Sequence, residues 1–99
     1  MYKIINKQRL HEIIYSMWIE APEVASSVQP GQFIILMITE KGERIPLTVA
    51  DFNREKGLIR IVFQVVGKTS EELSTLEEGD TLFSFIGPLG KKTEIENYG

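Results

Sequence analysis

The stretch RIPLTVAD, residues 44–51, raises the question on which the fold depends. Ile45, Leu47 and Val49 alternate with polar or smaller residues, which is the period-two pattern of a strand with one buried face. Pro46 interrupts this strand, and a proline cannot donate a hydrogen bond to a neighbouring strand. The strand therefore either lies at the edge of a sheet or has a backbone that faces something other than a strand.

Similar segments fill most of the chain on both sides of this stretch. We expect further strands over residues 2–10, 11–21, 32–39, 58–66 and 80–87. Leu73 and Leu76, with acidic residues before them and Gly79 after them, predict a short helix over residues 69–78. Residues 23–28 are read as a short turn or a helical stub.

Many short strands and one helix predict a six-stranded antiparallel Greek-key β-barrel with one short α-helix. Closure is favoured because an open sheet of this size would leave two edges to protect. The side chains expected to point inward are Ile13 or Ile14, Met17, Ile19, Phe33, Ile61 and Leu82.

The composition limits the possible functions. The 99 residues suit one domain, and with 14 acidic against 11 basic residues there is no basic cluster to neutralise a nucleic acid. The absence of cysteine excludes disulfides and thiolate metal sites within these residues. No apolar run reaches the length of a membrane span, so we expect a cytoplasmic protein with neither a nucleic acid nor a membrane as its partner.

The side chains offer little chemistry of their own. His11 is the only histidine, which excludes a site of several histidines, and we interpret it as a solvated strand residue. The carboxylates around the predicted helix are interpreted as solvated surface. We therefore expect no catalytic residue and no metal site, and a cofactor would have to carry any catalysis.

One local pattern predicts a ligand. In VVGKTSEEL, residues 65–73, a strand is followed by a glycine turn and the start of a helix. Free backbone N–H groups near Thr69 and Ser70 could bind a phosphate or pyrophosphate. The alternative is structural: Thr69 caps the helix and Glu72 completes a capping box. The residues alone leave both possibilities open.

Four segments, in order, make the chain resemble the flavin-binding barrel of the ferredoxin–NADP reductase superfamily. These segments are PGQF (30–33), RIPLT (44–48), VVGKTS (65–70) and EEGDTLFSFIGPLG (77–90). Within the superfamily, the chain is most similar to the branch of the dihydroorotate dehydrogenase electron-transfer subunit. That branch includes the small subunits of sulfide dehydrogenase and of NADH-dependent ferredoxin–NADP oxidoreductase.

The resemblance implies FAD as the cofactor and assigns a role to three segments. Pro46 would shape a platform for the isoalloxazine ring, Leu47 would pack on it, and Thr48 would lie near its redox-active edge. A second strand would pass the ribityl and adenine parts, and the turn after it would bind the pyrophosphate through its amides. The second strand contributes Phe63, Gln64 and Val65, and the turn contributes Gly67, Lys68, Thr69 and Ser70.

The chain departs from the family pattern beside Pro46. Many relatives have an arginine immediately before that proline, where it reaches the pyrophosphate, and this chain has Ile45. Arg44 lies one residue earlier, and on a strand a shift of one residue places the side chain on the opposite face. The role of Arg44 is therefore left open. Lys68 is the alternative source of positive charge.

The resemblance also implies a larger assembly. We expect residues 1–90 to form the FAD-binding domain and residues 91–99 to be a linker toward a nucleotide-binding domain. NAD(P) and a [2Fe–2S] cluster would belong to the complete subunit, and a larger catalytic subunit would be its partner. We expect a domain of a longer subunit or a gene fragment, not catalytically complete alone, with a stand-alone barrel as the alternative. The other interpretations are an FMN-type relative and a β-barrel that binds a protein without flavin.

Overall fold

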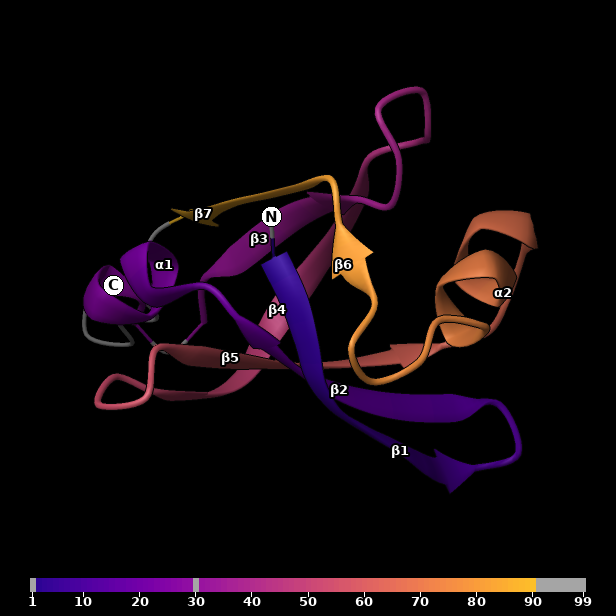
Figure 1. The fold of residues 1–99 in the computed structure, drawn as a ribbon, viewed down its shortest axis with the longest axis horizontal. Helices are drawn as coiled ribbons and strands as arrows, with labels where there is room; N and C mark the ends of the chain where they lie inside the picture. Colours follow the sequence, from indigo (N-terminus) through magenta and orange to yellow (C-terminus); the bar gives the residue numbers. More distant parts are fainter. Residues whose placement is uncertain (1, 30, 91–99) are drawn as a thin grey trace, which may run out of the picture.

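The computed structural model describes residues 2–29 and 31–90, and the expected linker over residues 91–99 lies outside this range. Figure 1 shows a curled sheet with one helix near each end. In chain order the elements are β1 (Tyr2–His11), β2 (Ile14–Glu20), α1 (Pro22–Ser27), β3 (Phe33–Met37), β4 (Ile45–Asn53), β5 (Leu58–Gln64), α2 (Lys68–Ser74), β6 (Thr81–Leu82) and β7 (Ser84–Leu89).

The strands form one nearly closed antiparallel barrel in the order β6-β1-β2-β5-β4-β3-β7. Strand β2 pairs with β5, so the connection from β2 to β3 crosses to another part of the barrel and carries α1. This confirms the predicted class of all-β barrel. Within the described residues, no helix is long and apolar enough to cross a membrane.

Among the described residues the barrel has seven strands where six were predicted, because the expected strand over residues 80–87 divides at Phe83. Strand β6 pairs with β1, whereas β7 pairs with β3. The N–H of Phe83 lies 3.0 Å from the carbonyl oxygen of Met37 and 3.2 Å from that of Ile38. The chain therefore changes partner at this residue, and the two edge strands of the sheet are consecutive in sequence.

The sequence also left open whether residues 23–28 form a turn or a short helix. Residues 22–27 form α1, which starts at Pro22, where a missing N–H is tolerated. Val24 and Ala25 are buried, so α1 closes one end of the barrel core. At the turn before β5, Gly57 has φ +68°, and an added Cβ would lie 2.8 Å from the Cβ of Pro22. Glycine is therefore required where this turn meets α1.

The core contains most of the residues that were predicted to point inward. Met17, Ile19, Ile61 and Leu82 are fully buried. Phe33 and Ile14 are half-buried, and Ile13 is 42% exposed because it lies in the turn between β1 and β2. The other buried apolar side chains are Ile4, Ala21, Val24, Ala25, Val28, Ile34, Leu36, Val49, Ile59, Phe63, Leu73 and Phe85.

Candidate functional site

A cleft of about 290 Å³ lies between the β3–β4 hairpin and the start of α2, and we call it the hairpin–turn cleft. It exists because β4 changes neighbours: Ile45 to Thr48 are in register with β3, whereas pairing with β5 begins at Val49. The strands β4 and β5 separate beyond that point. The lining residues are Glu43, Arg44, Ile45, Pro46, Val66, Gly67, Lys68, Thr69 and Ser70.

Pro46 lies in the part of β4 that has one strand neighbour. It is opposite Ile35 of β3 and is exposed on its other side. A residue without an N–H is tolerated here because β5 does not pair with this part of β4. The proline in RIPLTVAD thus marks the point where the strand borders a cleft.

The turn that precedes α2 is held by the hydroxyl of Ser70. Its oxygen accepts hydrogen bonds from the backbone N–H groups of Val66 (2.9 Å) and Gly67 (3.1 Å). Gly67 is the N-cap, and Ser70 is the third helical residue, where a polar side chain can reach back to the N-cap N–H. The structural alternative, in which Thr69 caps the helix and Glu72 completes a capping box, is therefore wrong, because α2 begins two residues earlier than that arrangement requires.

Gly67 contributes open space rather than an unusual backbone conformation. Its φ of −175° is accessible to any residue. The backbone at this position therefore does not require the conformational freedom of glycine. An added Cβ would meet no atom within 4 Å. No side chain caps the start of α2, and the first amides of a helix have no intrahelical acceptor. The amides of Val66 and Gly67 are bound by Ser70, so the amides available to a ligand are those at the start of α2, from Lys68 to Ser70.

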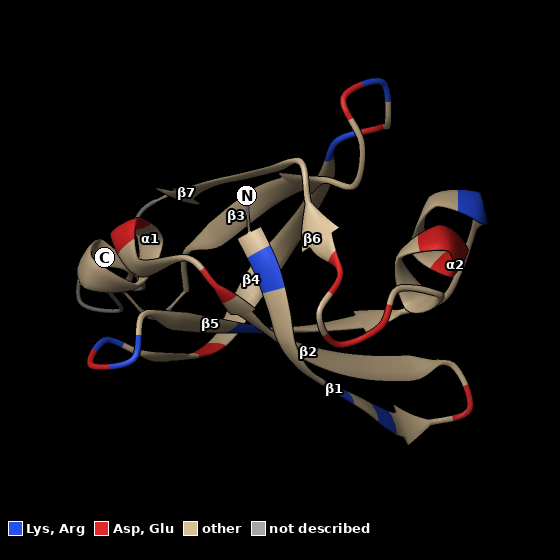
Figure 2. Cartoon of the chain, in the orientation of Figure 1, with Lys and Arg blue, Asp and Glu red and all other residues tan. Residues whose placement is uncertain are grey.

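Charges of both signs line the cleft, and Figure 2 shows them on the β3–β4 hairpin and on α2. Arg44 and Lys68 supply two exposed cations. Arg44 precedes β4, so strand alternation does not determine which way it points, and it lines the cleft together with Pro46. Glu43 supplies a carboxylate, whose Oε1 accepts a 2.6 Å hydrogen bond from Oγ1 of Thr69.

Five of the predicted site residues thus line one cleft, and the other five lie outside its lining. Thr48 and Gln64 are exposed. Leu47, Val65 and Phe63 turn toward the core: Leu47 and Val65 pack against it, and the ring of Phe63 lies 5.9 Å from that of Tyr15. Any contact of Leu47 or Phe63 with a ligand would therefore be made mainly by their backbone atoms.

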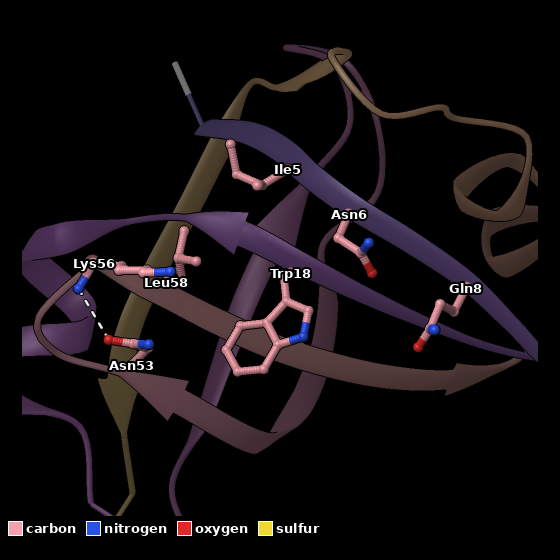
Figure 3. Close-up of a pocket in the computed structure, with 7 residues that line it drawn as sticks. All are labelled: Ile5, Asn6, Gln8, Trp18, Asn53, Lys56 and Leu58. Atoms are coloured by element: carbon pink, nitrogen blue, oxygen red, sulfur yellow. Dashed lines mark hydrogen bonds between the residues drawn. The ribbon is translucent and has the colours of Figure 1, made fainter.

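A second cleft, of about 390 Å³, lies on the outer face of the sheet around Trp18, and we call it the Trp18 cleft. Figure 3 shows the indole between residues of β1 on one side and residues of the β4–β5 hairpin on the other. The lining residues are Ile5, Asn6, Gln8, Trp18, Asn53, Lys56 and Leu58. It contains three carboxamides, one ammonium group and none of the predicted site residues.

The residues of the hairpin–turn cleft suit part of a flavin dinucleotide. Ligand sites typically measure about 300–1,000 Å³, so this cleft suits a diphosphate segment better than a whole dinucleotide. Uncapped amides, two cations and the free space at Gly67 match the chemistry of a diphosphate. The carboxylate of Glu43 is the one lining group that opposes it.

Comparison with curated proteins finds close relatives. The chain is 52% identical over 97 residues to a homologue of the electron transfer subunit of dihydroorotate dehydrogenase B (NAD⁺) from Thermotoga maritima. It is 56% identical over 95 residues to an uncharacterized protein from Clostridium beijerinckii. The two matches include 98% and 96% of this chain but only 34% and 32% of the respective relatives. The chain therefore spans about a third of the length of each relative.

The chain also matches solved structures. The chain matches the NADH-dependent reduced ferredoxin–NADP oxidoreductase with a TM-score of 0.93 and 50% identity, over 99% of this chain and 36% of that one. The ferredoxin reductase of carbazole 1,9a-dioxygenase matches with a TM-score of 0.72 at 18% identity, over 90% of this chain and 29% of that one, which supports the fold alone. No protein-family model matches the chain.

Proposed function

Because the chain belongs to the barrel domains of the ferredoxin–NADP reductase superfamily, in the branch of the dihydroorotate dehydrogenase electron-transfer subunit, we propose that it binds FAD. In this proposal it is the flavin module of an NAD(P)H-linked oxidoreductase. FAD, when bound, would supply the electron-transfer chemistry, and the chain would bind and orient it.

The hairpin–turn cleft is the observation that supports this proposal most strongly. Pro46 and the segment Gly67 to Ser70, which are about 20 residues apart in sequence, line the same cleft. The turn amides and Lys68 would hold the diphosphate, and Arg44 would add the second positive charge. Pro46 and Thr48 would border the ring system, because their side chains point outward from β4.

The FMN-type alternative concerns the same cleft. Both flavins carry phosphate, so the cleft charges alone do not separate them. Incubating the purified chain with FAD and FMN together, followed by desalting and chromatography of the released flavin, distinguishes them. We expect FAD to be retained in excess, and retention of FMN alone would favour the alternative.

The partner in this proposal is a larger catalytic subunit. The relatives include proteins named as electron transfer subunits, a name that implies assembly with another chain. The Trp18 cleft favours a docking surface, since it places one tryptophan among three carboxamides and a single ammonium group, and tryptophan is enriched at the centres of protein interfaces. It shares no lining residue with the hairpin–turn cleft, so both could be occupied together.

Co-purification tests this assignment. A tagged chain in its native cells should retain the partner, and Trp18→Ala should release it while Ile86→Ala, also on the outer surface, should not. Retention of the partner by Trp18→Ala would place the interface elsewhere. The same Trp18→Ala chain should bind FAD normally, because the Trp18 cleft shares no lining residue with the hairpin–turn cleft.

A further inference from the structure

Glu43 lines the hairpin–turn cleft, and its carboxylate contacts the first turn of α2. Its Oε1 accepts a 2.6 Å hydrogen bond from the hydroxyl of Thr69, which is 26 residues away in sequence. Glu43 belongs to the β3–β4 hairpin and Thr69 to the first turn of α2. This contact therefore joins the two walls of the cleft.

The charge of Glu43 is not neutralised by a salt bridge. Among the described residues the one ion pair joins Lys7 and Glu77, on another part of the surface. Arg44 and Lys68 line the same cleft as Glu43, so the lining holds two cations and one anion. An anion bound at the turn would lie close to this carboxylate.

We propose that Glu43 limits the affinity of the hairpin–turn cleft for anionic ligands. Its charge repels a diphosphate bound at the turn, and the ligand must displace the carboxylate from Thr69 to reach that hydroxyl. This inference rests on the proposed function, since it concerns the same cleft. Two unit charges about 4 Å apart in water interact by about 1 kcal/mol, which corresponds to about fivefold in affinity.

Glu43→Gln isolates the effect of the charge, because glutamine keeps the length of the side chain and an oxygen that accepts from Thr69. We expect this variant to bind FAD about fivefold more tightly than the parent at low salt, and the gain to shrink toward zero at about 1 M salt. Riboflavin, which has no phosphate, should bind both proteins equally. Glu40→Gln on the same hairpin, outside the lining, is the matched control and should not change FAD affinity.

Glu43→Ala adds a second test, because it removes the hydrogen bond as well as the charge. A gain equal to that of Glu43→Gln supports the inference. A gain seen in the alanine variant alone overturns it, because the contact rather than the charge would be limiting. Equal FAD affinity of Glu43→Gln and parent, or an equal gain with riboflavin, overturns the inference and leaves the proposed function intact. Failure of the parent to bind FAD overturns both.

Discussion

The hydroxyl of Ser70 both accepts from the N–H of Gly67 and donates to its carbonyl oxygen, each at 3.1 Å. This reciprocal contact fixes the turn that leads into α2. The Ser70 hydroxyl is therefore committed to the protein, and a ligand at this turn must rely on the backbone amides and the nearby cations. A substitution at Ser70 can change the charge of the turn without changing its shape, provided that the new side chain still accepts these hydrogen bonds.

Ser70→Asp is such a substitution. A carboxylate at the third helical position can accept from the same N–H groups but cannot donate to the Gly67 carbonyl oxygen, so the free energy of unfolding should fall by about 1 kcal/mol. Its negative charge should lower FAD affinity by about 2 kcal/mol, or about 30-fold, through repulsion of the diphosphate. Flavin fluorescence titration measures this loss, and thermal unfolding checks the fold. His11→Ala, at the exposed end of β1 and outside the lining of the cleft, should leave both quantities unchanged.

Gly67→Val tests the free space beside the turn. The extended backbone at Gly67 is accessible to valine, but valine is a poorer N-cap than glycine, so the free energy of unfolding should fall by no more than about 1 kcal/mol. The new side chain should block close approach to the amides and weaken FAD binding by about tenfold or more, since a charge-assisted hydrogen bond is worth about 1.5–3 kcal/mol. Gly57→Ala is the contrasting control: its positive φ and the nearby Pro22 should lower the melting temperature. Unchanged FAD affinity in Gly67→Val would mean that the ligand does not approach this turn.

Leu47→Asp and Thr48→Asp separate the two faces of β4. Leu47 packs against the core, so its replacement by a carboxylate should cost about 3 kcal/mol or more of stability. Thr48 is exposed, so Thr48→Asp should keep the fold and weaken flavin binding. Chemical denaturation and FAD titration of both variants measure these effects. A Thr48→Asp chain that binds FAD like the parent would remove Thr48 from the site.

Ile61→Ala tests the core of the barrel. Ile61 is fully buried and lies between Met17 of β2 and Val49 of β4, so its truncation should cost about 3 kcal/mol. Ile86→Ala, at a side chain that is 53% exposed, should cost less than about 0.5 kcal/mol. Urea denaturation followed by circular dichroism gives both values. Similar losses in the two variants would contradict the arrangement of β7.

Much of the fold could be predicted because side-chain alternation is a local property. Ile59, Ile61 and Phe63 are buried on one face of β5, as their spacing indicates. The division of the last strand could not be predicted, because it depends on the pairing of Phe83 with β3, more than 40 residues earlier. The extent of α1 was equally uncertain, since its burial arises from packing and not from periodicity.

The candidate site was only partly accessible from sequence for the same reason. Motif likeness identified Pro46 and the turn from Gly67 to Ser70, but it left Arg44 undecided, because the start of β4 determines whether strand alternation applies to that residue. Glu43 was missed because its role depends on a contact with Thr69 across the cleft. A contact between distant segments leaves no local pattern in the sequence.

The central proposal is that FAD binds at the hairpin–turn cleft. The most direct test is titration of FAD into the parent chain and into Ser70→Asp, followed by flavin fluorescence at low salt. We predict saturable binding of one FAD per chain for the parent and about 30-fold weaker binding for the variant. Absence of saturable binding to the parent, or equal affinity of the two proteins for FAD, would contradict this proposal.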